Sequence, residues 1–168
     1  ETKGESLAKG MQYLMRDMQA KNIQMVEPDA FKVGTDLGTT PGRVVLRNRM
    51  VELIHYTPTT EKVHKTPIVF ITSWKNPTAE MADVSFDDYL RDGVDASVKA
   101  VCALCKVPQV HLTGYCIGGT LVATYMAWAS RHYGEKKMPV AHWTLFTTLT
   151  DFSKPGDIDV FIDEGTVA

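Results

Sequence analysis

The cysteine at position 116 stands in a pattern that places a nucleophile at a sharp turn. Residues 110–120 run from a short apolar strand through a G-x-C-x-G motif into a helical pattern. This is the layout of a nucleophile elbow, with cysteine as the nucleophile. Gly114 and Gly118 flank Cys116 because a strand that reverses sharply into a helix brings those backbones into contact, where a Cβ would clash. We therefore predict Cys116 to be a catalytic nucleophile.

The elbow would also set up the chemistry of an acyl transfer. It holds Cys116 at the N-terminus of the following helix, where the partial positive charge of the unpaired N–H groups favours a thiolate. The backbone N–H of Ile117 would then point to where an acyl oxyanion forms. The alternative is a simple turn with a buried cysteine. The strand before it, the helix after it and the additional Gly119 favour the catalytic interpretation.

A cysteine nucleophile that takes an acyl group usually needs a histidine within hydrogen-bond reach. His111 is five residues upstream on the same strand, about 16 Å away. His132 lies near the far end of the following helix, about 24 Å away. His142 begins the neighbouring strand, at the wrong edge of the sheet. His55 and His64 precede this core, and nothing places either over the elbow. The sequence supplies a nucleophile and no evident base.

Hydrophobic spacing and turn residues predict the elements that would position this site. They are a helix over 5–20, an antiparallel hairpin of strands 43–46 and 51–56, a strand over 67–74, a helix from a Ser85/Asp88 capping box to about 106, a strand over 109–113, a helix over 117–133 and a strand over 140–149. Alternating strands and helices predict a parallel α/β sheet, whose chemistry collects at the C-terminal strand edges. Asp151 would share that edge with Cys116. The unbroken apolar run 67–74 predicts a strand buried on both faces.

Composition narrows the class of protein. The chain has 168 residues, 44% of them hydrophobic, and a net charge of −2 with a pI near 6.2, so no basic surface indicates nucleic-acid binding. No signal peptide and no run as long as a membrane span is present, and three cysteines are an odd count. We therefore expect a reducing, cytoplasmic setting.

Two further features have a structural and a functional interpretation. Cys102 and Cys105 form a C-x-x-C near the end of a predicted helix, without the partners of a zinc site, so small core residues are a better account than metal or redox chemistry. The helix over 5–20 carries a methionine-rich apolar face, which we expect to pack in a core, although it could bind a flexible partner.

Several motifs, in order along the chain, resemble the polyhydroxyalkanoate (poly-3-hydroxybutyrate) synthases of class I. The box Gly114 to Thr120 resembles the lipase-like box of that family. The other matching stretches are 31–34, 40–45 with Asn48, 53–56 before Pro58, 73–77, 87–89, 149–152 and 159–165. The resemblance thus extends from about residue 31 to residue 166.

The resemblance implies an α/β fold of partial α/β-hydrolase type, a parallel sheet with crossover helices preceded by an N-terminal helix and hairpin. It implies two regions, an N-terminal synthase region over 1–66 and a catalytic core over 67–168. The implied activity is an acyltransferase that polymerises (R)-3-hydroxyacyl-CoA, releases CoA and holds the polyester on Cys116 as a thioester. Coenzyme A is part of the substrate and no cofactor is implied. Implied partners are the polyester granule surface and a second synthase subunit.

The chain departs from the family pattern in two places. Strands resembling 67–70 and 71–74 are separated in the family by a few dozen residues but are fused here, which removes the loop expected to give the second oxyanion donor. The family's catalytic Asp and His should follow Ala168. We therefore expect an internally shortened, C-terminally truncated synthase, inactive by itself. The alternatives are a cysteine esterase or thioesterase of the same superfamily, and a non-catalytic fragment that associates with a synthase or with granules.

Overall fold

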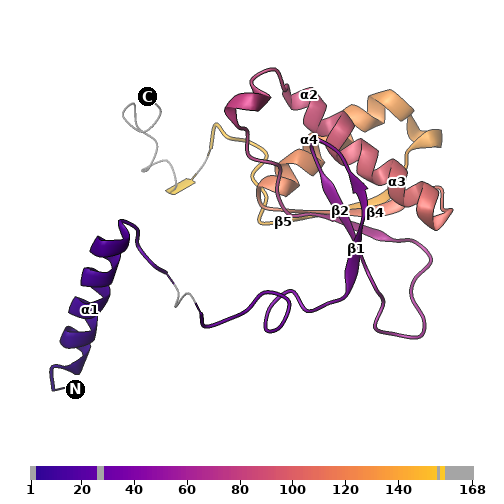
Figure 1. Cartoon of the computed structure of the whole chain (residues 1–168). Coiled ribbons are helices and arrows are strands. Elements are labelled where there is room, and N and C mark those ends of the chain that lie inside the picture. The colour runs from indigo at the N-terminus through magenta and orange to yellow at the C-terminus, as the bar shows by residue number, and fades with distance from the viewer. Residues whose placement is uncertain (1–2, 26–28, 155, 158–168) are drawn as a thin grey trace. The chain divides into compact units, whose positions relative to one another are not determined.

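The computed structural model describes residues 3–25, 29–154, 156 and 157. The chain divides into two compact units, residues 1–41 and residues 42–168 (Figure 1). The two units are compact parts of the structure and say nothing about which part has which function. The functional boundary predicted between residues 66 and 67 therefore stays a prediction.

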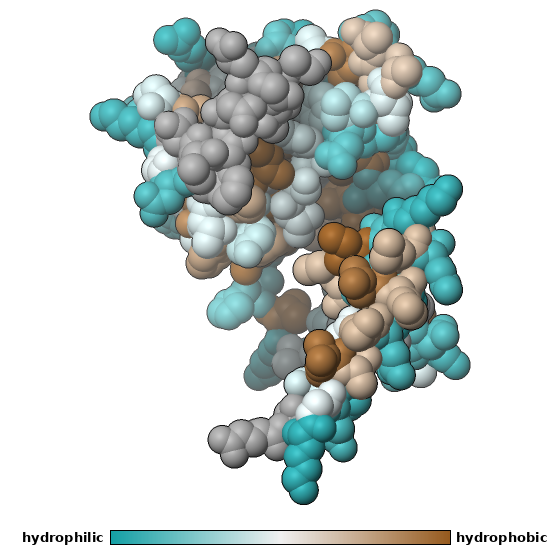
Figure 2. Space-filling view, turned by 90° about the vertical axis from the view of Figure 1, so that its left-hand side faces the viewer, coloured by the Kyte–Doolittle hydropathy of each residue, from teal (hydrophilic) through white to brown (hydrophobic). Residues whose placement is uncertain are grey.

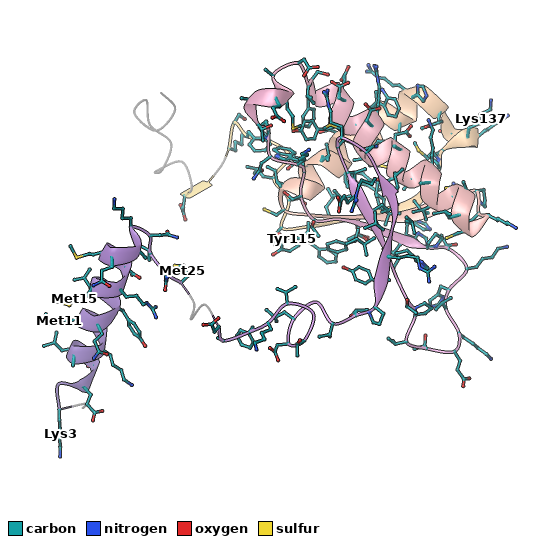
Figure 3. The ribbon with its side chains drawn as sticks, viewed as in Figure 1. Lys3, Met11, Met15, Met25, Tyr115 and Lys137 are labelled. Carbon is teal, nitrogen blue, oxygen red and sulfur yellow. The ribbon has the colours of Figure 1, made fainter. Side chains whose placement is uncertain are left out.

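The first unit contains the predicted N-terminal helix, α1 (Glu5–Ala20). Its apolar face, which carries Leu7, Met11, Leu14, Met15 and Met18, forms a brown and tan stripe in Figure 2. Met11 and Met15 project from the same side of the helix (Figure 3). The expectation that this face packs in a core is wrong: the five side chains are 54–70% exposed, and α1 has no buried residue. The remainder of this unit that the structure describes has one isolated bridge, Val33 to Leu37, and therefore offers no apolar layer to cover the helix.

The second unit begins with the predicted antiparallel hairpin. Strand β1 (Gly42–Arg47) pairs with β2 (Glu52–Tyr56), with an irregularity between Val44 and Leu46. Asn48 closes the turn, because its side-chain oxygen accepts hydrogen bonds from the N–H groups of Met50 and Val51 at 2.8 and 2.9 Å. The Asn48 amide also donates to the carbonyl of Asp92 at 2.8 Å, which fastens the hairpin to the helical layer.

A three-stranded parallel sheet carries the site. Its strands are β3 (Ile68–Ile71), β4 (Val110–Tyr115) and β5 (Val140–Phe146), in the order β3-β4-β5. The parallel α/β prediction is therefore confirmed. The finer assignment to the α/β-hydrolase type stays a prediction.

The helices of the second unit pack on one face of this sheet (Figure 1). A helical stretch from Phe86 to Cys105 precedes β4 and consists of α2 (Phe86–Asp88), the π-helical turn η2 (Tyr89–Asp95) and α3 (Ala96–Cys105). Helix α4 (Ile117–Tyr133) follows β4, and the short 3-10 turns η1 (Ala79–Met81) and η3 (Glu135–Lys137) complete the connections. The core joins these layers through Val69, Leu90, Val94, Val98, Val110, Leu112, Leu121, Val122, Tyr125, Ala129 and Val140. No helix among the described residues is both long and apolar enough to cross a membrane.

The prediction for residues 67–74 is wrong in length and in burial. Strand β3 has four residues, and its side chains alternate between a buried Val69, 3% exposed, and the open Ile68 and Phe70, at 69% and 52%. The reason is that an unbroken apolar run predicts burial on both faces only when both faces have a covering layer. Here the helices cover the Val69 face alone. Strand β5 likewise ends at Phe146, three residues before the predicted end.

One buried carboxylate links the two helices of the core. Asp95, 4% exposed, accepts hydrogen bonds from the hydroxyls of Tyr125 at 3.0 Å and Tyr133 at 2.6 Å. Lys99 approaches its second oxygen at 2.7 Å. The pKa of Tyr125 is raised mainly by burial of its hydroxyl and further by the charge of Asp95. The phenol therefore stays protonated and remains a donor to the carboxylate. The network ties η2 and α3 to α4, the helix that starts at the site.

Candidate active site

Cys116 occupies the turn between β4 and α4 as predicted. Its backbone has φ 52° and ψ −122°, outside the ordinary regions for a residue with a side chain. The residue is exposed and its thiol is free. Such a conformation persists only where the surroundings enforce it, and it is concentrated at functional sites.

The glycines around Cys116 explain how the turn is enforced. A Cβ on Gly114 would lie 2.5 Å from the Cα of Gly119, so strand and helix backbones touch there as expected. A Cβ on Gly118 would overlap the carbonyl oxygen of Ile71, at the end of β3. A Cβ on Gly119 would overlap the hydroxyl of Thr148. The first turn of α4 is thus enclosed by β4, β3 and the segment after β5.

Hydrogen bonds hold the turn on the sheet edge. The N–H of Cys116 donates to the carbonyl of Phe146 at 3.0 Å, and the carbonyl of Cys116 accepts from the N–H of Gly119 at 2.9 Å. The Thr120 hydroxyl donates to the carbonyl of Leu149 at 2.7 Å. Ile117 begins α4, so its N–H is one of the donors without a partner inside the helix. Among the described residues this N–H has no hydrogen-bond partner, and its role as an oxyanion donor stays a prediction.

The histidines of the sheet lie away from the elbow, as predicted. His111 pairs with His142 across β4 and β5, and their rings stack at 5.2 Å. Four steps along the ladder separate this pair from Tyr115, about 13 Å at ~3.3 Å per residue. His132 is near the end of α4, where its ring stacks on Trp128 at 4.5 Å. Within the described part of the chain, no hydrogen bond from a histidine reaches the thiol of Cys116.

Asp151 lies beyond β5 and is exposed. Its carboxylate accepts hydrogen bonds from the side chain and the backbone of Ser153, at 2.6 and 3.0 Å, and these hold its pKa below the usual value. The Asp151 carboxylate therefore stabilises the local turn that contains Asp151 and Ser153. The matching stretch 159–165 lies outside the described residues.

Only one of the two cysteines of the C-x-x-C motif lies in the core, where both were expected. Cys102 packs against the core, and burial raises the pKa of its thiol. Cys105 is exposed, so the expectation of two core cysteines is wrong for this residue. Helix α3 ends at Cys105 and the chain turns away at Lys106, with φ 54°, which leaves the last turn uncovered. Among the described residues no group of three or more potential ligands could hold a metal ion.

Sequence reasoning missed two sets of residues. The walls formed by Ile71 and Thr148 come from segments more than 25 residues away in sequence, and no local pattern identifies them. The Asp95 network was also missed, although the i,i+4 spacing of Asp95 and Lys99 on a predicted helix was a usable signal.

Comparison with known proteins identifies the family. Residues 1–78 match the family described as Poly-beta-hydroxybutyrate polymerase (PhaC) N-terminus. The Poly(3-hydroxyalkanoate) polymerase subunit PhaC of Cupriavidus necator is 33% identical over 99% of this chain and 33% of its own length. The Poly(3-hydroxyalkanoate) polymerase of Methylorubrum extorquens is 32% identical over 99% of this chain and 33% of its own length. This chain belongs to the poly(3-hydroxyalkanoate) polymerase family. It spans about a third of the length of these curated relatives.

The alignment also bears on the expected internal shortening. It runs over 198 residues with the Cupriavidus necator polymerase and over 202 with the Methylorubrum extorquens polymerase, whereas this chain has 168. About 30 residues of the first polymerase and about 35 of the second therefore face no residue of this chain. This agrees with a segment missing from within the matched region.

Proposed function

We propose that Cys116 is the acyl-carrying nucleophile of a poly(3-hydroxyalkanoate) polymerase. The supporting observation is its exposed position at the β4–α4 turn, with φ 52° and with glycines that no alanine could replace without a clash. The membership of the chain in the polymerase family supports (R)-3-hydroxyacyl-CoA as the substrate class. The polyester granule surface, a second synthase subunit and a cytoplasmic location belong to the same proposal.

The proposed step is a thioester exchange. The sulfur of Cys116 attacks the carbonyl carbon of the hydroxyacyl-CoA, and the N–H of Ile117 donates a hydrogen bond to the developing oxyanion. The bond from carbon to the CoA sulfur breaks, a new bond joins the acyl group to Cys116, and the CoA thiol leaves with the proton. Because a thiol replaces a thiol, the exchange is close to balanced in leaving-group basicity.

Repeated turnover needs a base that the described residues do not bring to Cys116. We therefore propose that the 168-residue chain does not polymerise by itself. It accepts at most one acyl group per chain and releases at most one equivalent of CoA.

Intact-mass spectrometry after incubation with (R)-3-hydroxybutyryl-CoA tests both parts. The expected result is a single acyl adduct, mapped by peptide digestion to Cys116 and absent from Cys116→Ala. Cys105→Ala is the matched control, because it removes another exposed thiol that does not lie in a strand-to-helix turn. An adduct that survives Cys116→Ala would refute the nucleophile. Continued CoA release beyond one equivalent would refute the proposed inactivity, and hydrolysis of p-nitrophenyl butyrate without adduct accumulation would favour an esterase.

A further inference from the structure

A cleft of about 1090 Å³ lies between the hairpin and β3. One wall is the run from Val51 to Pro58, the other is the run from Pro67 to Ser73, and the last turns of α3 add Leu104 and Cys105. The lining is mainly apolar. Three of its large side chains, Ile68, Phe70 and Leu104, are 69%, 52% and 59% exposed.

The cleft is bordered by a strand edge. Successive side chains of a strand point to opposite faces, so a strand whose consecutive residues all line a cleft turns its edge toward it. Every residue of β3, from Ile68 to Ile71, lines the cleft. In the part of the chain that the structure describes, β3 pairs with β4 alone. The N–H and C=O groups on its other edge are therefore free to pair with a further strand.

The size of the cleft fits one strand. Strands lie ~4.8 Å apart, sheets pack ~10 Å apart and a residue rises ~3.3 Å, so a strand residue takes up roughly 160 Å³. A cleft of about 1090 Å³ then holds about six or seven residues. The Cupriavidus necator polymerase carries about 30 residues that have no counterpart here, enough in number for a strand and a helix.

We propose that this cleft accepts one extended apolar β-strand along the open edge of β3, donated by a longer polymerase of the same family. Main-chain hydrogen bonds to β3 provide the affinity, and Leu104 with the apolar wall of the hairpin receives the side chains. The proposal depends on the shortened sheet and not on the chemistry of Cys116, so either can fail without the other.

Binding of a synthetic peptide to the full 168-residue chain tests the proposal. The probe is a fluorescein-labelled peptide copying the longest apolar run among the residues of the Cupriavidus necator polymerase that have no counterpart in this chain. We expect saturable binding by fluorescence anisotropy, and slower hydrogen exchange at the amides of residues 68–71 when the peptide is bound. A peptide N-methylated at alternate residues should not bind, because it cannot form the ladder.

Two charge substitutions distinguish binding in the cleft from nonspecific binding of the peptide to exposed apolar side chains. Leu104→Lys places an ammonium in the apolar lining and should weaken binding about tenfold. Val63→Lys is the matched control, because Val63 is 67% exposed, against 59% for Leu104, and does not line the cleft. Equal loss in both variants, no binding, or exchange that is unchanged at 68–71 would overturn the proposal. Concentration-dependent dimerisation that protects the same amides without peptide would also overturn it, since the occupant would then be a second copy.

Discussion

Gly118→Ala tests whether the elbow depends on contact between α4 and the end of β3. The added methyl would overlap the carbonyl oxygen of Ile71 and lie 2.8 Å from the carbonyl carbon of Thr72. Both are backbone atoms of an ordered strand end and cannot move aside as a side chain does. Overpacking costs about 1–3 kcal/mol, and the upper half of that range applies against backbone. The helix-propensity gain of alanine over glycine offsets up to about 1 kcal/mol.

The expected net loss is therefore about 2 kcal/mol of unfolding free energy for Gly118→Ala. For a unit of this size, that lowers the melting temperature by roughly 6–10 °C. Circular dichroism at 222 nm during heating measures the shift, and the reaction rate of Cys116 with a disulfide reagent reports whether the turn has moved.

Gly93→Ala provides the matched control for this measurement. It makes the same chemical change in a helical segment of the same unit, and beyond the adjacent backbone of its own helix its Cβ would meet no atom within 4 Å. It should be neutral or stabilising by up to about 1 kcal/mol. If Gly118→Ala melts at the temperature of Gly93→Ala with unchanged Cys116 reactivity, the close approach of α4 to β3 does not maintain the elbow.

Two more predictions concern the helical layer. Tyr125→Phe removes one of the three donors to Asp95 and should cost about 1–2 kcal/mol in urea unfolding, because the carboxylate is buried; an unchanged midpoint would show that the other two donors suffice. Asp88 accepts the N–H of Ser85 at 2.7 Å, and this bond first, then the Ser85 hydroxyl, lowers its pKa below the ordinary value of 3.8. A lowered pKa gives stability above 3.8 that is lost as the pH falls through the folded value. The titration of the Ser85 amide resonance should have its midpoint below 3.8, and a midpoint above 3.8 would contradict the assignment.

The elements that could be predicted from sequence are those fixed by adjacent residues. Helix α4 has the predicted bounds because Gly114 to Gly119 sets its start and Gly134, at φ 67°, sets its end. The Ser85/Asp88 capping box begins the helical stretch at the predicted residue. In each case the signal and the structure it specifies lie within one helical turn.

The features that could not be predicted depend on distant partners. Burial of Phe70 and of the apolar face of α1 requires a second layer, and an apolar sequence does not say whether the chain provides one. The site divides in the same way. The positions of Cys116 at the turn and of Ile117 at the start of α4 follow from the local motif, whereas the contact with Ile71 depends on the order of strands in the sheet.

That wall explains how the elbow can persist in a shortened chain. The resemblance places the fusion of two family strands between Phe70 and Ile71, and Ile71 is the residue whose carbonyl packs on Gly118. Because Ile71 continues β3 in register with Gly114, its backbone supports α4 through main-chain position and not through its side chain. Any residue that continued β3 would present the same carbonyl. The elbow would therefore tolerate loss of the segment between the two fused strands, and the open edge of β3 is the place where that loss changes the sheet.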